Sequence, residues 1–114
     1  MAFESGEIFE RVLRMQESGE RGVLVTVVRA DGSTPRKVGT RMLIFENGEI
    51  SGTIGGGQVE QAVKEQAKVV LETGSPTVRQ FKLTHELAMC CGGQMTFLLE
   101  KLRLLYDVVP VKIQ

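Results

Sequence analysis

The chain has 114 residues, enough for one compact domain and too few for a complete dinucleotide-binding fold of two βαβαβ halves. Its 14 lysines and arginines are balanced by 14 aspartates and glutamates, so no overall positive charge is available to hold a nucleic acid or an anionic membrane. With 42% hydrophobic residues and no membrane-length apolar run, we expect a globular, cytoplasmic protein that binds neither nucleic acid nor membrane.

The first predicted elements are a helix over residues 4–18 and a strand over residues 22–29. Apolar side chains recur on one stripe of the helix, at Ile8, Val12 and Met15. The strand is an almost unbroken apolar, β-branched run, which is typical of a strand covered on both faces, so we expect it inside the sheet. A polar loop with one proline and two glycines follows over residues 31–40.

A β-hairpin is predicted next, from strands over residues 42–45 and 50–54 joined at Asn47-Gly48. A two-residue turn at this dipeptide places Phe45 opposite Ile50. Three glycines then precede a helix over residues 58–73, whose apolar residues recur at helical spacing. Residues expected on the buried side of this helix are Val59, Val63, Ala67, Val70 and Leu71.

The last predicted strands cover residues 77–83 and 94–102, with a loop over residues 84–93 between them. The elements together predict the α+β class: a single domain with a mixed β-sheet, a β-hairpin and two main helices packed on the sheet. Residues expected in the core are Val25, Val27, Ile44, Val63 and Phe97.

Three segments carry side chains suited to chemistry. The first is the glycine run Gly55-Gly56-Gly57, at the start of a helix, where free backbone N–H groups can face a ligand. It is neither a Walker loop nor a dinucleotide fingerprint, because Gln58, Val59 and Glu60 stand where those motifs require other residues. The alternative is a tight strand-to-helix turn with Glu60 as a partner of the helix dipole.

The second segment contains Ser33, Thr34 and Arg36, which offer two hydroxyls and a guanidinium suited to oxyanions. Its alternative is a surface turn with a solvated arginine. The third contains Cys91, Gly92 and Gly93, where exposed backbone N–H groups would favour a thiolate. Its alternative is a buried thiol, and the adjacent pair formed by Cys90 and Cys91 lacks the spacing of a structural disulfide or zinc site.

The segments become recognisable in combination. They read VxRxDGSTPRKVGTRMLI over residues 27–44, GTIGGGQVE over residues 52–60 and CGGQMTFLLE over residues 91–100. In order and spacing they resemble the amino-terminal domain of the XdhC/CoxI family, the xanthine dehydrogenase accessory proteins. The resemblance extends to about residue 102. It implies one such domain over residues 1–114. Many members of the family continue into a Rossmann-like carboxy-terminal domain, which we do not expect here, so the chain would be a stand-alone short form, one half of a split pair, or a fragment.

The resemblance implies a molybdenum cofactor (molybdopterin) chaperone, which binds the cofactor transiently and assists its sulfuration and its insertion into a xanthine dehydrogenase-type hydroxylase. Carried onto this chain, the glycine run would suit the phosphate, the segment of Arg36 would suit oxyanions or pterin, and Cys91 would be a candidate molybdenum ligand. One departure is Gln58, which is bulky and has no thiol where relatives often have a small residue or cysteine, and this puts metal ligation from the glycine run in doubt.

We therefore expect a non-catalytic cofactor-binding protein. Its expected partners are the hydroxylase, a cysteine desulfurase, a second copy of the chain in a homo-oligomer, and a separate Rossmann-domain chain. Two alternatives remain open: a small sulfur- or nucleotidyl-transferring component that uses Cys91, and a maturation scaffold that does not bind cofactor.

Overall fold

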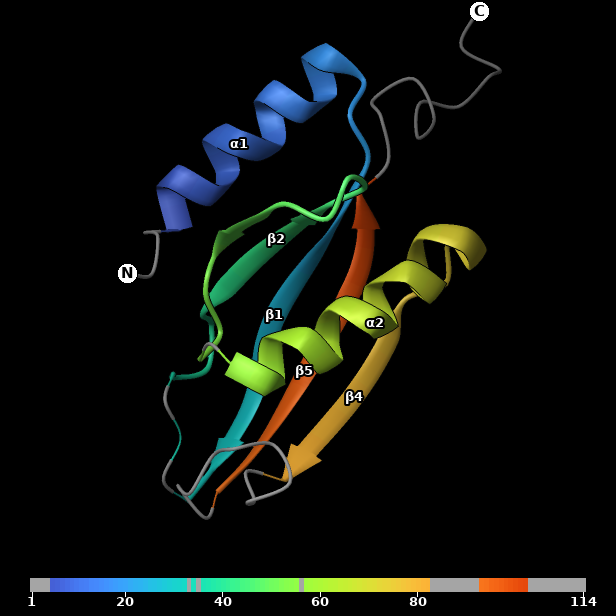
Figure 1. Cartoon of the computed structure of the whole chain (residues 1–114). Coiled ribbons are helices and arrows are strands. Elements are labelled where there is room, and N and C mark those ends of the chain that lie inside the picture. The colour runs from blue at the N-terminus through green and yellow to red at the C-terminus, as the bar shows by residue number, and fades with distance from the viewer. Residues whose placement is uncertain (1–4, 33, 35, 56, 83–92, 103–114) are drawn as a thin grey trace, which may run out of the picture.

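The computed structural model describes residues 5–32, 34, 36–55, 57–82 and 93–102. They form two helices and five strands in one sheet of order β3-β2-β1-β5-β4. The elements are α1 (Ser5–Ser18), β1 (Gly22–Asp31), β2 (Arg41–Phe45), β3 (Ile50–Gly52), α2 (Gly57–Thr73), β4 (Thr77–Lys82) and β5 (Gln94–Leu102). The apolar run is the middle strand, as predicted, and the α+β class with two helices and a hairpin is confirmed (Figure 1).

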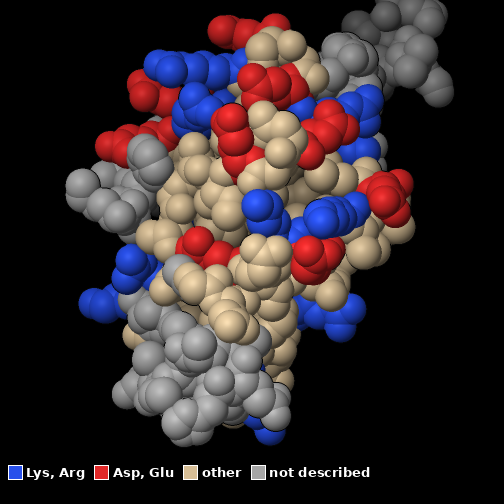
Figure 2. Space-filling view, viewed as in Figure 1, with Lys and Arg blue, Asp and Glu red and all other residues tan. Residues whose placement is uncertain are grey.

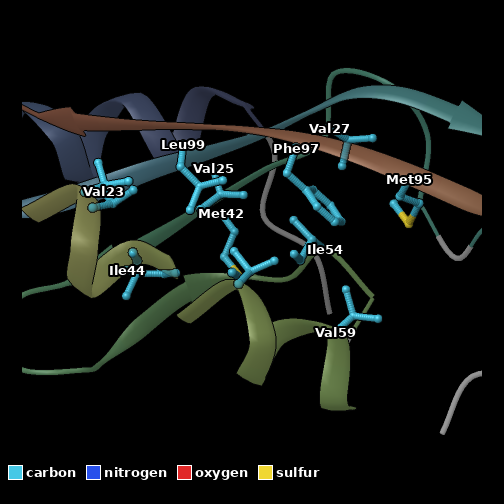
Figure 3. Packing of buried hydrophobic residues seen from close by; sticks show 13 residues of the cluster. Val23, Val25, Val27, Met42, Ile44, Ile54, Val59, Met95, Phe97 and Leu99 are labelled. Carbon is cyan, nitrogen blue, oxygen red and sulfur yellow. The ribbon is translucent and has the colours of Figure 1, made fainter. Parts of the chain in front are cut away.

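Helix α2 covers one face of the sheet and closes the main core. One side of the helix contributes Val59, Val63, Ala67 and Val70, which pack on alternate residues of β1 and β5 (Figure 3). All five residues predicted for the core are no more than 2% exposed. The helix ends at Gly74, whose N–H donates to the Val70 carbonyl at 2.8 Å.

Helix α1 covers part of the opposite face. Its residues Ile8 and Met15 pack against Leu43 and Phe45 of β2 in a smaller cluster. The next residues around the helix, Phe9 and Leu13, are 49% and 65% exposed. No helix in the described part of the chain is long and apolar enough to cross a bilayer.

The sheet differs from the predicted mixed sheet, because every strand pairing among the described residues is antiparallel. The two strands joined through α2 do run in the same direction, as expected of such a crossover. However, β3 and β4 form opposite edges of the sheet, with three strands between them. Among the described residues, these two parallel-running strands therefore do not pair, and the sheet is antiparallel rather than mixed.

The hairpin is displaced by one residue from the predicted pairing. Ile50 lies opposite Ile44 rather than Phe45, and Phe45 instead closes the turn, donating its N–H to the Glu49 carbonyl at 2.8 Å. The loop therefore has three residues, and Gly48 takes the left-handed conformation at φ 94° that a type I turn followed by a bulge requires. Strand β3 also ends at Gly52, two residues before the predicted end.

Candidate functional site

The segments singled out in the sequence meet the sheet at one end. Strand β1 ends at Asp31, opposite the first residue of β5, Gln94, which also pairs with Lys82 at the end of β4. Strand β3 ends at Gly52, opposite Met42 near the start of β2. The loop over residues 32–40 therefore leaves β1 at this end, where the chain also leaves β4 and enters β5, and the turn over residues 53–57 leaves β3 on the same side but at the level of Val25, six residues before the end of β1 (Figure 1). We call these the arginine loop and the glycine loop.

The arginine loop is folded back against the central strand. Val27 of β1 accepts the Gly39 N–H at 2.8 Å, and its own N–H donates to the Thr40 carbonyl at 2.9 Å. The Thr34 hydroxyl donates to the Arg36 carbonyl at 3.1 Å, inside the loop. Both Thr34 and Arg36 are half-buried. The strand therefore holds the end of the loop at Gly39 and Thr40, and Thr34 and Arg36 are joined to each other within the loop.

Arg41 braces the base of the arginine loop. Its Nη1 donates to the Gly39 carbonyl at 3.3 Å, and its guanidinium carbon lies 5.5 Å from the centroid of the Phe9 ring. This arginine therefore joins β2, the loop and α1. Within the loop itself the cationic residues are Arg36, which is half-buried, and Lys37, which is exposed.

Gly52, the last residue of β3, and Gly57, the last residue of the glycine loop, have different surroundings. A Cβ on Gly52 would lie 3.0 Å from the Arg41 carbonyl oxygen, so the close approach of β2 and β3 requires glycine there. A Cβ on Gly57 would meet nothing within 4 Å, yet its φ of 63° also favours glycine. The backbone at Gly57 is therefore open to a molecule approaching the start of α2.

Thr53 and Glu60 hold the glycine loop, and the sequence analysis did not find this pair. Glu60 Oε2 accepts a hydrogen bond from the Thr53 hydroxyl, and it accepts the Ile54 N–H at 3.0 Å. Thr53 Oγ1 accepts the Gly55 N–H at 3.1 Å. The signal was present in the sequence, since a hydroxyl residue and a carboxylate residue stand on either side of the glycines, one before them and one in the first helical turn.

Charges are mixed in sign over the α2 face of the molecule, where Figure 2 shows blue and red atoms interspersed without a broad area of either. This agrees with the formal net charge of zero. The arginine loop differs locally, because residues 32–40 contain Arg36 and Lys37 and no acidic residue. Attraction of an anion is therefore a local property of this loop.

The structure brings part of the predicted site to one end of the sheet. Thr34 and Arg36 lie in the arginine loop, Gly55 and Gly57 in the glycine loop, and Gly93 is buried next to the first residue of β5. The other predicted binding residues, Ser33, Gly56, Cys91 and Gly92, lie outside the described residues. The predicted metal ligand Cys91 is among them, and no group of three or more metal-ligating side chains occurs in the described part of the chain.

A small hollow of about 120 Å³ lies at the other end of the sheet. It is lined by Glu20 and Arg21 before β1 and by Phe45, Glu46 and Asn47 at the hairpin turn. None of these belongs to the predicted site. The two loops, rather than this hollow, unite the chemistry-bearing segments.

Comparison with known families decides the assignment. A model of the XdhC and CoxI family matches residues 15–82, more than half of the chain. The chain belongs to this family. The matched region runs from α1 to β4 and includes both the arginine loop and the glycine loop.

Individual relatives agree with the family assignment. The chain is 34% identical over 91 residues to the molybdenum cofactor insertion chaperone PaoD of Escherichia coli, covering 75% of this chain and 28% of that protein. It is 32% identical over 93 residues to the uncharacterized protein YqeB of the same organism, covering 78% of this chain and 17% of that protein. The chain thus spans less than a third of the length of these curated relatives.

A solved structure shares the fold. The crystal structure described as a xanthine dehydrogenase from Bacillus halodurans superposes with a TM-score of 0.74 at 27% sequence identity. The match covers 83% of this chain and 30% of that one. The XdhC/CoxI chain therefore corresponds to one part of a longer architecture.

Proposed function

We propose that this XdhC/CoxI chain is a non-catalytic binding module for the molybdenum cofactor. In this role it holds the cofactor transiently while the cofactor is sulfurated, and it assists insertion into a xanthine dehydrogenase-type hydroxylase. The observation that carries the proposal is the placement of the arginine loop and the glycine loop at the same end of the sheet, in a chain of this family.

The residues present fit the chemistry of this cargo. Molybdopterin presents an anionic phosphate, a polar pterin and molybdenum held by sulfur. Arg36 supplies a guanidinium for oxyanions, and the open backbone at Gly57 allows close approach of a flat polar group. In the proposal, Cys91 supplies a soft thiolate toward molybdenum.

The relatives support the maturation role. PaoD is named an insertion chaperone for the molybdenum cofactor, and the structural neighbour is described as a xanthine dehydrogenase. The proposed partners of this chain are accordingly the molybdenum hydroxylase, a cysteine desulfurase and a separate chain with a Rossmann domain. The proposed location is the cytoplasm, where such assembly takes place.

The proposed work of the chain is to bind, orient and shelter the cargo. The arginine loop provides charge-assisted hydrogen bonds, which fix an anionic group in both position and direction. Gly39 and Thr40 already hold the end of the loop on Val27, which reduces the conformational entropy lost there when a ligand binds. No bond of the cargo is broken by a residue of this chain.

Purification of the chain after co-expression with cofactor biosynthesis tests the proposal. The protein is purified under reducing conditions, and the pterin is then released, oxidised and measured by its fluorescence. We expect pterin to be present in an amount comparable to that of the protein. The absence of pterin would contradict cofactor binding and favour a scaffold. Radiolabelled sulfur found covalently on Cys91 would contradict a non-catalytic role and favour a sulfur-transferring component.

Self-association is part of the proposal. A module of this size has limited concave surface to shelter a large cofactor. The sequence beyond β5 is rich in apolar residues, at Leu104, Leu105, Tyr106, Val108, Val109, Val111 and Ile113. We expect deletion of residues 103–114 to abolish a homo-oligomer in sedimentation experiments without unfolding the domain. A full chain that sediments as a strict monomer and binds no Rossmann-domain chain would contradict this part.

A further inference from the structure

Thr53 and Glu60 stand on either side of the glycines and fix the course of the chain into α2. Glu60 is half-buried in the first helical turn, where its Oε2 accepts the Thr53 hydroxyl and the Ile54 N–H. Thr53 in turn accepts the Gly55 N–H. One carboxylate oxygen therefore ties the first half of the glycine loop to the helix that follows it.

The side chain of Ile54 anchors the first half of the glycine loop to the hydrophobic core. Its side chain is completely buried in the core under α2, in the cluster that also contains Val59 and Val63 (Figure 3). The backbone of Ile54 is thus held by Glu60 and its side chain by the core. The stretch from Thr53 to Gly55 is therefore fixed by hydrogen bonds and by core packing, which limits the conformational freedom of a segment next to glycines.

Glu60 also sets the charge of this stretch. Residues 52–60 contain no lysine or arginine, so the carboxylate of Glu60 is their one full charge. It lies in the first turn of α2, where the partial positive charge of the helix start stabilises it. A second anion at this place would meet a like charge at close range. The arginine loop has the reverse composition, with two cations and no acid.

We propose that Glu60 is a positioning and specificity residue. With Thr53 it holds the glycine loop in shape, and its charge excludes anions from the start of α2. The anionic group of the ligand is then bound by the arginine loop, while the glycine loop faces an uncharged part such as the pterin. This assignment reverses the expectation that the glycine run takes the phosphate. The identity of the ligand rests on the proposed function. The roles of Glu60 in holding the glycine loop and in excluding anions do not depend on it.

Amide hydrogen exchange tests the control of shape. In Glu60→Ala the Ile54 and Gly55 amides should exchange about 10-fold faster or more, the factor expected for loss of a hydrogen bond to a charged group. Glu60→Gln should stay within about threefold of the wild type, because its amide oxygen still accepts both bonds. Glu65→Ala, at an exposed position of the same helix, is the matched control.

Unchanged exchange at Ile54 and Gly55 in folded Glu60→Ala would overturn the positioning role. If that variant does not fold, Thr53→Val and Thr53→Ser replace it. Loss of the hydroxyl in Thr53→Val should speed exchange of the Gly55 amide, and Thr53→Ser should restore the slow rate, since only the hydroxyl accepts that N–H. Equal rates in the two Thr53 variants would also contradict the proposal.

Titration with inorganic phosphate, followed by amide NMR shifts, tests the exclusion of anions. In the wild type, phosphate should shift the amides of Arg36 and Lys37 and leave those of Gly57 and Gln58 in place. In Glu60→Gln the Gly57 and Gln58 amides should shift as well, because the loop keeps its shape and loses its charge. Phosphate shifts at Gly57 in the wild type would overturn the proposal.

These experiments separate the inference from the proposed function. The hydrogen-exchange and phosphate-titration experiments do not use the cofactor, so a chain that binds no pterin can still give the results expected of Glu60. With molybdopterin as the probe, Arg36→Ala should lower affinity for the phosphorylated form more than for a dephosphorylated pterin, and Glu60→Ala should lower both by the same factor. Selective loss of the phosphorylated form in Glu60→Ala would contradict the assignment.

Discussion

The core under α2 and the loops at the end of the sheet differ in how their residues are held. In the core, side chains such as Val25 and Phe97 are fully buried among apolar neighbours. In the loops, Thr34 and Arg36 are half-buried, among the described loop residues only Gly39 and Thr40 form backbone hydrogen bonds to β1, and the backbone of Gly57 is open. The comparison separates two properties. Substitutions in the core should change the free energy of unfolding, and substitutions in the loops should change ligand affinity.

The largest expected loss of stability comes from Phe97→Ala. The Phe97 ring is fully buried, and its centroid lies 5.8 Å from that of Phe81. Removing a ring of this kind should lower the free energy of unfolding by about 3–5 kcal/mol, because a cavity replaces packed atoms. Urea unfolding measures the change. A loss below about 1 kcal/mol would show that the core does not carry the stability.

A smaller loss is expected for Gly22→Ala, where α1 meets the sheet. The added Cβ would lie 2.7 Å from Met15 Cε and 2.9 Å from the Ile44 carbonyl oxygen. The methionine can move, but the backbone oxygen cannot, so we expect a loss of about 1–3 kcal/mol in the same unfolding experiment. Full stability in this variant would mean that the contact between α1 and the sheet is loose.

Gly57→Ala probes the boundary between the two regions. The substitution strains a left-handed backbone by about 1–2 kcal/mol but meets no neighbour within 4 Å. Gly19→Ala is the matched control, since Gly19 has a φ of 80°, equally open surroundings and a position at the end of α1. Both variants should lose similar stability, and only Gly57→Ala should also weaken pterin binding, as a titration would show. Equal binding in the two variants would remove Gly57 from the site.

The smallest effect is expected on the exposed side of α1. Leu13 is 65% exposed, so Leu13→Ala should change the free energy of unfolding by no more than about 0.5 kcal/mol. It also lies on a different element from either loop, and cofactor affinity should be unchanged. A clear loss of stability, measured in parallel with Phe97→Ala, would mean that this side chain is covered in solution, as a subunit contact would require.

Much of the fold follows from local patterns. The unbroken apolar run identifies β1 as the middle strand, and helical spacing identifies the buried side of α2. Pairing across the sheet was less predictable. The register of the hairpin depends on the left-handed Gly48, and a one-residue shift preserves the Asn-Gly pattern on which the prediction rested.

The position of β4 in the sheet and the pairing of Thr53 with Glu60 depend on contacts that the sequence pattern alone does not predict. Strand β4 could pair with β3, which would give a mixed sheet, or it could join the opposite edge, which gives the antiparallel sheet observed. The connection from β3 through α2 to β4 is long enough for either arrangement. The pairing of Thr53 with Glu60 depends on the turn between them, so the sequence identified the glycines of the loop and missed the residues that hold them. Local conformation was predictable, and long-range geometry was not.

Affinity for molybdopterin in Arg36→Ala tests the central claim most directly. Loss of a hydrogen bond to a charged group should weaken binding by about 1.5–3 kcal/mol, or roughly 10- to 150-fold. The free energy of unfolding is measured in parallel, because Arg36 is half-buried and a loss of affinity must be separated from a loss of stability. Arg14→Ala, at an exposed position of α1, is the matched control and should change neither quantity. Unchanged affinity in Arg36→Ala, or an equal loss in Arg14→Ala, would contradict cofactor binding at the arginine loop.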